Sequence, residues 1–120
     1  MAIVINKPTQ IKAAGTKPKI IQEFIGRVNT KTDTLSIAVM TSPQGWEEPG
    51  QKPEFDEYTL VLEGSVHVKT LKNEYTIPTG QCFIAQKGAW VKYSTPGKGG
   101  AKYVAVCLPA FSPQTVHRDE

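Results

Sequence analysis

Apolar and polar residues alternate along much of this 120-residue chain, and this pattern constrains the fold more than any other feature. The alternation is clear over residues 35–40, 59–62 and 102–108. A period of two is typical of a strand that buries one face. No segment combines the apolar stripe and the capping residues of an amphipathic helix. The sequence therefore predicts an all-β protein.

Turn-forming residues separate the alternating segments at nearly regular intervals. Glycine occurs in the groups at residues 64–65, 78–80, 86–88 and 95–97, and we expect a tight turn at the first of these. Residues 20–25 are more ambiguous, and we interpret them as another strand. Short strands with turn chemistry at such intervals indicate a β-sandwich or a β-barrel.

Composition excludes several classes of partner. The net charge is only +3 and the lysines are spread along the chain, whereas a nucleic-acid partner usually requires a denser basic face. No apolar run is long enough to cross a bilayer, so we expect no membrane partner. The N-terminal residues contain no basic segment followed by a long apolar core, so we expect no secretory signal. We expect a cytoplasmic protein.

Both cysteines, Cys82 and Cys107, lie in apolar runs and not in a C-x-x-C pair. This placement predicts buried thiols, the common fate of free cysteine. Whether their geometry allows a disulfide is left open by the sequence.

Two segments, residues 45–64 and 80–95, resemble the paired sequence motifs of the cupin family. Glu57 and Gly64 match the last two positions of the first motif. Gly80 and Gly88 match the glycines of the second motif, in the expected order. The resemblance implies a double-stranded β-helix, which is a jelly-roll β-barrel.

The histidines that make the cupin motifs a metal site are missing. In the first motif their positions fall on Gly50 and Lys52, or on Gln51 and Pro53, according to the spacing used. Val91 takes the place of the histidine in the second motif. Three of the four usual metal ligands of the family are therefore absent, and we expect no bound metal or other cofactor.

The resemblance covers most of the chain, and we expect residues 1–120 to form a single cupin domain. The tail, residues 109–120, is similar to that of a subgroup of small bacterial cupins that includes ethanolamine-utilisation cupins. Small cupins commonly pair through their sheets, which also removes an open sheet edge. A homodimer is therefore expected.

The predicted function is binding of a small polar metabolite in the barrel mouth, where cupins characteristically place their sites. If Glu57 points inward as in the family, burial should raise its affinity for a proton. Glu57 and Tyr93 are then the candidate catalytic residues for acid-base chemistry of the lyase or isomerase type. Alternatively, Glu57 only accepts hydrogen bonds that hold its loop.

The side chains expected to bind the ligand are Gln51, Glu54, Thr59, Trp90 and Tyr103. Thr59 follows Glu57 by two positions and so shares its face of the strand. Trp90 could stack on a ligand or plug the core. The parity of the last strand does not decide whether Tyr103 faces inward.

Two other functions remain open. A metal-dependent dioxygenase or isomerase could use oxygen donors from the segment that holds Glu48, Gln51, Glu54 and Glu57. The two histidines, His67 and His117, fall outside the ligand positions of the family. A non-catalytic sensor or assembly module would bind a ligand or assemble without turnover.

Overall fold

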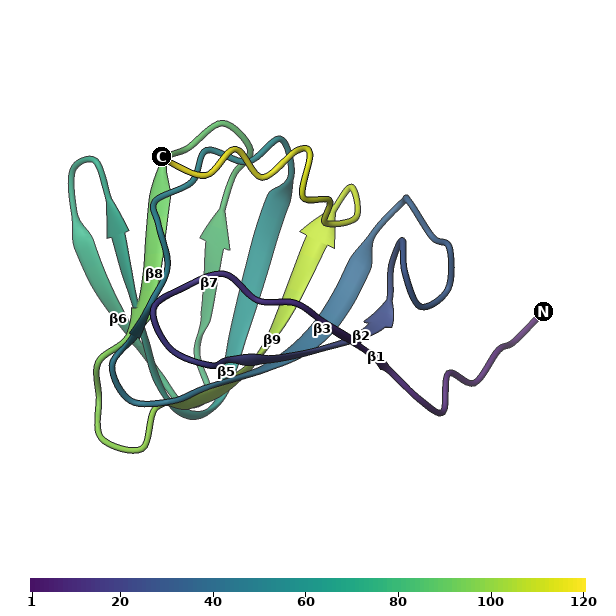
Figure 1. The fold of residues 1–120 in the computed structure, drawn as a ribbon, viewed down its shortest axis with the longest axis horizontal. Helices are drawn as coiled ribbons and strands as arrows, with labels where there is room; N and C mark the ends of the chain where they lie inside the picture. The colour runs from purple at the N-terminus through teal and green to yellow at the C-terminus, as the bar shows by residue number, and fades with distance from the viewer.

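A computed structural model describes all 120 residues, and it confirms the all-β prediction. Residues 20–25 form a strand, as expected. No helix capable of crossing a membrane is present. The strands are β1 (Thr9–Ile11), β2 (Ile20–Ile25), β3 (Ser36–Ser42), β4 (Trp46–Glu47), β5 (Asp56–Thr70), β6 (Glu74–Pro78), β7 (Cys82–Ala85), β8 (Val91–Thr95) and β9 (Ala101–Leu108) (Figure 1).

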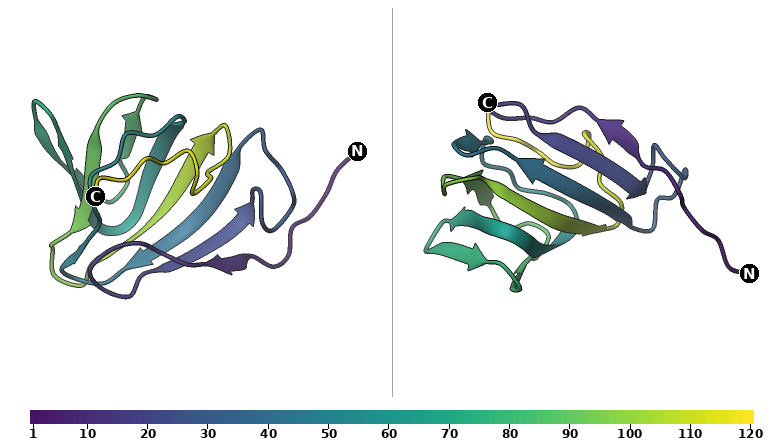
Figure 2. Two further views of the ribbon diagram at one scale, coloured as in Figure 1. Left: turned by 45° about the horizontal axis from the view of Figure 1, so that its top comes forward. Right: turned by 90° about the horizontal axis from the view of Figure 1, so that it is seen from below.

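The strands pair in an antiparallel sheet in the order β1-β2-β3-β9-β5-β8-β4, with β6 and β7 also paired to β5. The first part of β5 pairs with β9 and β7, and its second part pairs with β6 and β8. The sheet curls around a concave side, as the two turned views in Figure 2 show. The result is the curved jelly-roll architecture expected from the sequence.

The turn predicted at residues 64–65 does not exist, because β5 runs through this position without a break. The pairing of β5 with β9 shifts register between Val61 and Glu63. Gly64 then adopts a φ of 73°, and a Cβ at this position would lie 2.1 Å from the backbone oxygen of Gly100. The glycine therefore allows a bulge and a close approach of two strands, instead of a chain reversal.

Two groups of buried side chains form the core. The larger group contains ten residues, and one of them, Trp46, has no exposed surface. The smaller group contains Phe55, Cys107 and Val116, with Phe111 of the C-terminal tail packed against it. Between them, the concave side is only partly filled.

The cysteines face opposite sides of the sheet. Cys107 is buried and pairs with Glu57 in register, as expected for an inward-facing thiol. Cys82 is exposed, which corrects the prediction that it is buried, because it pairs with Leu60 on the outer face. Both thiols are free.

Residues 12–19, called the strap below, connect β1 to β2 and pass across the open side of the curved sheet (Figure 1). The backbone nitrogen of Thr16 donates to the oxygen of Glu47 at 2.9 Å, and the nitrogen of Glu47 donates to Oγ1 of Thr16 at 3.2 Å. The indole Nε1 of Trp46 donates to the oxygen of Ala14 at 3.1 Å. These bonds attach the strap to β4.

Candidate functional site

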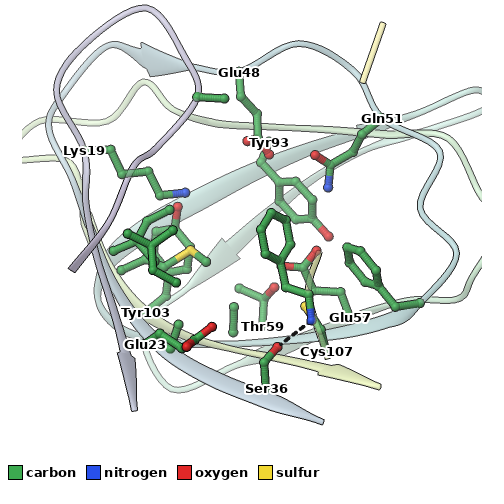
Figure 3. Close-up of a pocket in the computed structure, with 18 of the residues that line it drawn as sticks. Lys19, Glu23, Ser36, Glu48, Gln51, Glu57, Thr59, Tyr93, Tyr103 and Cys107 are labelled. Carbon is green, nitrogen blue, oxygen red and sulfur yellow. Dashed lines mark hydrogen bonds between the residues drawn. The ribbon is translucent and has the colours of Figure 1, made fainter. Parts of the chain in front are cut away.

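A cavity of about 60 Å³ lies between the concave face of the sheet, the strap and the C-terminal tail. Figure 3 shows the side chains of Glu48, Gln51, Glu57 and Tyr93 directed toward a common space, with Lys19 reaching in from another side. A cavity of this size has room for a few water molecules or a small organic group. The polar side chains in its otherwise largely apolar wall distinguish it from an ordinary packing defect.

Strand register explains how the cavity wall is built. Glu57 on β5 pairs with Cys107 on β9, which in turn pairs with Ser36 on β3. The next inward row contains Thr59, Ala105 and Ala38, which are all buried. Because residues two apart face the same side of a strand, small side chains in these rows leave space above the sheet.

Four buried side-chain atoms have no hydrogen-bond partner, and all four belong to residues that line the cavity. They are Oε1 of Gln51, Oγ1 of Thr59, the hydroxyl of Tyr93 and Nε of Arg118. A buried polar atom without a partner costs about 1–3 kcal/mol. A polar molecule in the cavity would supply the missing partners.

Two carboxyl groups of the cavity, those of Glu48 and Glu57, bind protons more tightly than usual. Burial, followed by the nearby charge of Glu48, raises the pKa of Glu57 from 4.5 to about 7. Burial also raises the pKa of Glu48. Lys19 and Arg118 oppose both increases through their positive charges. Glu57 can therefore give or take a proton near neutral pH.

Neighbouring groups in the cavity stay protonated. Burial and then the charges of Glu57 and Glu48 raise the pKa of Tyr93 well above its ordinary value, so its hydroxyl is a neutral donor. Burial likewise raises the pKa of the Cys107 thiol far above neutrality. A thiol that is not ionised is a poor nucleophile.

Five of the residues proposed from the sequence meet at this cavity, namely Gln51, Glu57, Thr59, Tyr93 and Tyr103. Tyr103 faces inward, and its hydroxyl lies 3.0 Å from Oγ of Ser42. The structure thus gives the direction of the Tyr103 side chain, which the alternation of residues in the last strand did not decide. The roles of the five residues remain predictions.

Glu54 and Trp90, which were also expected at the site, lie outside the cavity. The exposed carboxylate of Glu54 contacts Nε2 of His117 in the tail. The indole of Trp90 donates to Oδ2 of Asp119 at 2.9 Å and packs against Gly50. Both side chains hold the C-terminal tail on the outside of the barrel, which is why neither reaches the ligand space.

Five charged residues of the cavity wall were not proposed as ligand-binding residues from the sequence: Lys12, Lys19, Glu23, Glu48 and Arg118. Glu48 appeared only in the alternative metal set. Glu23 accepts hydrogen bonds from the backbone nitrogens of Val28 and Asn29, at 3.0 and 2.7 Å. Lys19 and Arg118 belong to the strap and the tail, whose positions depend on tertiary packing that no local pattern signals.

The donor set does not fit a divalent first-row metal. No three residues of the types His, Cys, Asp and Glu are grouped so that they could hold an ion. Of the oxygen donors in the metal alternative, Glu54 lies outside the cavity, leaving two carboxyls and the amide of Gln51. His67 and His117 instead contact Glu74 and Glu54 at the surface.

Comparison with curated proteins gives one relative with a partial match. Endoribonuclease YbeY from Myxococcus xanthus is 40% identical over 101 residues, which are 84% of this chain but 34% of that protein. The chain thus spans about a third of the length of its curated relative. No family model matches the sequence.

Solved structures identify the fold. Ethanolamine utilization protein Q from Salmonella typhimurium LT2 superposes with a TM-score of 0.68 and 16% identity, covering 88% of this chain and 98% of that one. The Cnp3 cupin domain of Schizosaccharomyces pombe gives 0.66 and 14%, covering 76% and 61%. The chain has the cupin fold. At such low identities these neighbours show the fold of this chain and not its chemistry.

Proposed function

We propose that this cupin binds a small polar metabolite in its cavity, without a metal, and that Glu57 exchanges a proton with it. The observation that carries the proposal is the set of four unpaired polar atoms, on Gln51, Thr59, Tyr93 and Arg118, that line one cavity. Native proteins seldom leave buried polar atoms unpaired, and exceptions call for a functional or solvent partner.

Acid-base chemistry of the lyase or isomerase type follows from the two side chains that the sequence singled out. Glu57, with a pKa of about 7, can accept a proton from one atom of the ligand and return it to another. The Tyr93 hydroxyl stays protonated and can donate a hydrogen bond to an oxygen of the ligand. A protein that binds the ligand but does not exchange a proton with it corresponds to the non-catalytic sensor alternative.

The volume limits the ligand. A water molecule needs about 10–15 Å³ of such space, so the cavity of about 60 Å³ fits roughly four to six non-hydrogen atoms without movement of its walls. This size favours compounds of two to four carbons that carry hydroxyl, carboxyl or amino groups.

Binding can be tested with a panel of such compounds by ligand-observed NMR and thermal shift. Glu57→Gln should weaken the binding of any hit or abolish its turnover. Glu54→Gln is the matched control, because Glu54 is a carboxylate of the same region that lies outside the cavity. Equal effects of the two variants, or no hit for the wild type, would refute the proposal. Binding without turnover would support the sensor alternative.

We do not propose endoribonuclease activity, which the name of the Myxococcus xanthus relative states, for this chain. The match covers 34% of that protein, and the cavity presents the carboxyls of Glu48 and Glu57. A polyanion such as RNA is usually bound by concentrated positive charge. A cytoplasmic location, expected from the sequence, stays a prediction.

We also propose that the protein forms a homodimer through the outer face of β3, β5, β7 and β9. Apolar side chains gather there, at Ile37, Val39, Tyr58, Leu60, Leu62, Ile84, Val104, Val106 and Leu108. Leu60 and Ile84 are 41% and 58% exposed. Exposed apolar patches of this kind often mark interfaces.

The dimer can be tested by light scattering after size exclusion. Ile84→Lys should produce monomers, whereas Leu71→Lys, at an exposed leucine of the β5–β6 connection, should leave the dimer intact. A monomeric wild type at micromolar concentrations would contradict this assignment.

A further inference from the structure

The strap places a positive charge inside the cavity. The Nζ atom of Lys19 lies 4.0 Å from the ring centroid of Trp46 and 5.2 Å from that of Tyr103. Both distances are within the range of a cation-π interaction. Lys19 forms no ion pair within 4.0 Å, so its ammonium group contacts aromatic rings and not a carboxylate.

The two rings belong to the rigid core and not to the strap. Trp46 has no exposed surface, and Tyr103 is 3% exposed. Both belong to the same buried apolar group. Tyr103 is further held by Ser42. The aromatic walls are therefore fixed whether or not the Lys19 side chain lies between them.

The cavity that Lys19 enters also contains hydrogen-bond acceptors. Glu48 lines the same cavity, and neither its carboxyl nor that of Glu57 forms an ion pair within 4.0 Å. Oε1 of Gln51 has no donor. An ammonium group has three N–H donors and no acceptor, so it complements such a wall. Aromatic faces together with carboxyls are a common solution for binding organic cations.

We propose that the space between Trp46, Tyr103 and Glu48 is a subsite for the primary ammonium group of a ligand, and that Lys19 occupies it in the free protein. The Lys19 side chain then competes with external amines for this subsite. A tethered group acts at an effective concentration in the millimolar range or above, so it suppresses the binding of weak external amines. This subsite goes beyond the acid-base function proposed for Glu57 and uses different side chains.

Truncation of the competitor tests the subsite. Lys19→Ala removes three methylene groups and the ammonium, which together have the shape of propylammonium. This variant should bind propylammonium at least about 10-fold more tightly than the wild type, as measured by calorimetry in buffer of matched ionic strength. It should bind 1-propanol, the neutral analogue, much more weakly.

Lys19→Met provides the matched control, because it removes the charge but keeps the space filled. It should bind neither probe. Adding Glu48→Gln to Lys19→Ala should reduce the affinity for propylammonium, while leaving the aromatic walls in place. If Lys19→Ala binds propylammonium no better than the wild type, or binds both probes equally, Lys19 is a fixed part of the wall and the subsite does not exist.

A measurement on the wild type keeps the proposal testable if Lys19→Ala fails to fold. The indole N–H of Trp46 gives a distinct NMR signal, and it bonds to the strap at Ala14. High concentrations of propylammonium should shift this signal, whereas 1-propanol and potassium chloride should not. Absence of a shift at saturating amine would overturn the proposal. Neither result bears on Glu57, so a failure here is distinguishable from failure of the acid-base function.

Discussion

Replacing Glu57 with glutamine should change how the stability of the protein depends on pH. The pKa of Glu57 is about 7 in the folded protein, compared with an ordinary value of 4.5. The folded state therefore retains this proton between pH 4.5 and 7, while the unfolded chain loses it. Stability must decrease as the pH rises through this window, because the folded state binds more protons.

The size of this effect follows from the pKa difference. Each pKa unit corresponds to 1.36 kcal/mol, so the rise from 4.5 to about 7 corresponds to about 3 kcal/mol. This loss is absent below pH 4.5 and complete above pH 7. Glutamine has a similar shape and no charge. Glu57→Gln should therefore match the wild type near pH 4.5 and exceed its free energy of unfolding by about 3 kcal/mol at pH 8.

Urea denaturation between pH 4.5 and 8 measures this difference, and ¹³C NMR of the Glu57 carboxyl measures the pKa itself. Glu63→Gln is the matched control, since Glu63 is an exposed carboxylate on the same strand. A residual slope in Glu57→Gln is expected from Glu48, whose pKa is also raised by burial. Identical pH profiles for Glu57→Gln and the wild type would refute the reasoning, as would a measured pKa near 4.5.

Two further substitutions test the cavity and the fold. Tyr93→Phe removes a buried hydroxyl that has no hydrogen-bond partner. Thermal unfolding should therefore show a stability that is unchanged or higher by up to about 1 kcal/mol. A loss of stability above about 1 kcal/mol would show that the hydroxyl forms a hydrogen bond, for example to water. Gly64→Ala would place a Cβ 2.1 Å from the backbone oxygen of Gly100 at a φ of 73°, so urea denaturation should show a loss of at least about 2 kcal/mol. An unaffected Gly64→Ala would mean that the bulge tolerates a side chain.

The fold could be predicted because its signals are local. Alternation defines the strands, and Glu57 with Gly64 anchors a family motif at a fixed spacing. The meaning of Gly64 was nevertheless misjudged, since a glycine can mark either a turn or a bulge, and only pairing with β9 distinguishes them. The prediction that Cys82 is buried was wrong for a related reason: only its pairing with β5 shows that it lies on the outer face of the sheet.

The candidate site was predictable only where it is built from strands. Thr59 is two residues after Glu57 and therefore faces the same side of the strand. Tyr93 lies on a strand within the second motif. Lys19 and Arg118 reach the cavity from segments without regular structure, so periodicity contains no information about them. Glu54 and Trp90 lie within the segments that resemble the motifs, but their side chains contact His117 and Asp119 of the tail.

The long strand β5 also determines when the cavity can form during folding. It pairs with four other strands, and thirty residues of sequence lie between it and its partner β9. Closing such distant pairs carries an entropic cost that slows folding. Because Glu57 gains its inward position only when β5 and β9 are paired, a partly folded chain has no binding site. Ligand binding should therefore report on completed folding, and a ligand should slow global unfolding without accelerating the earliest steps of folding.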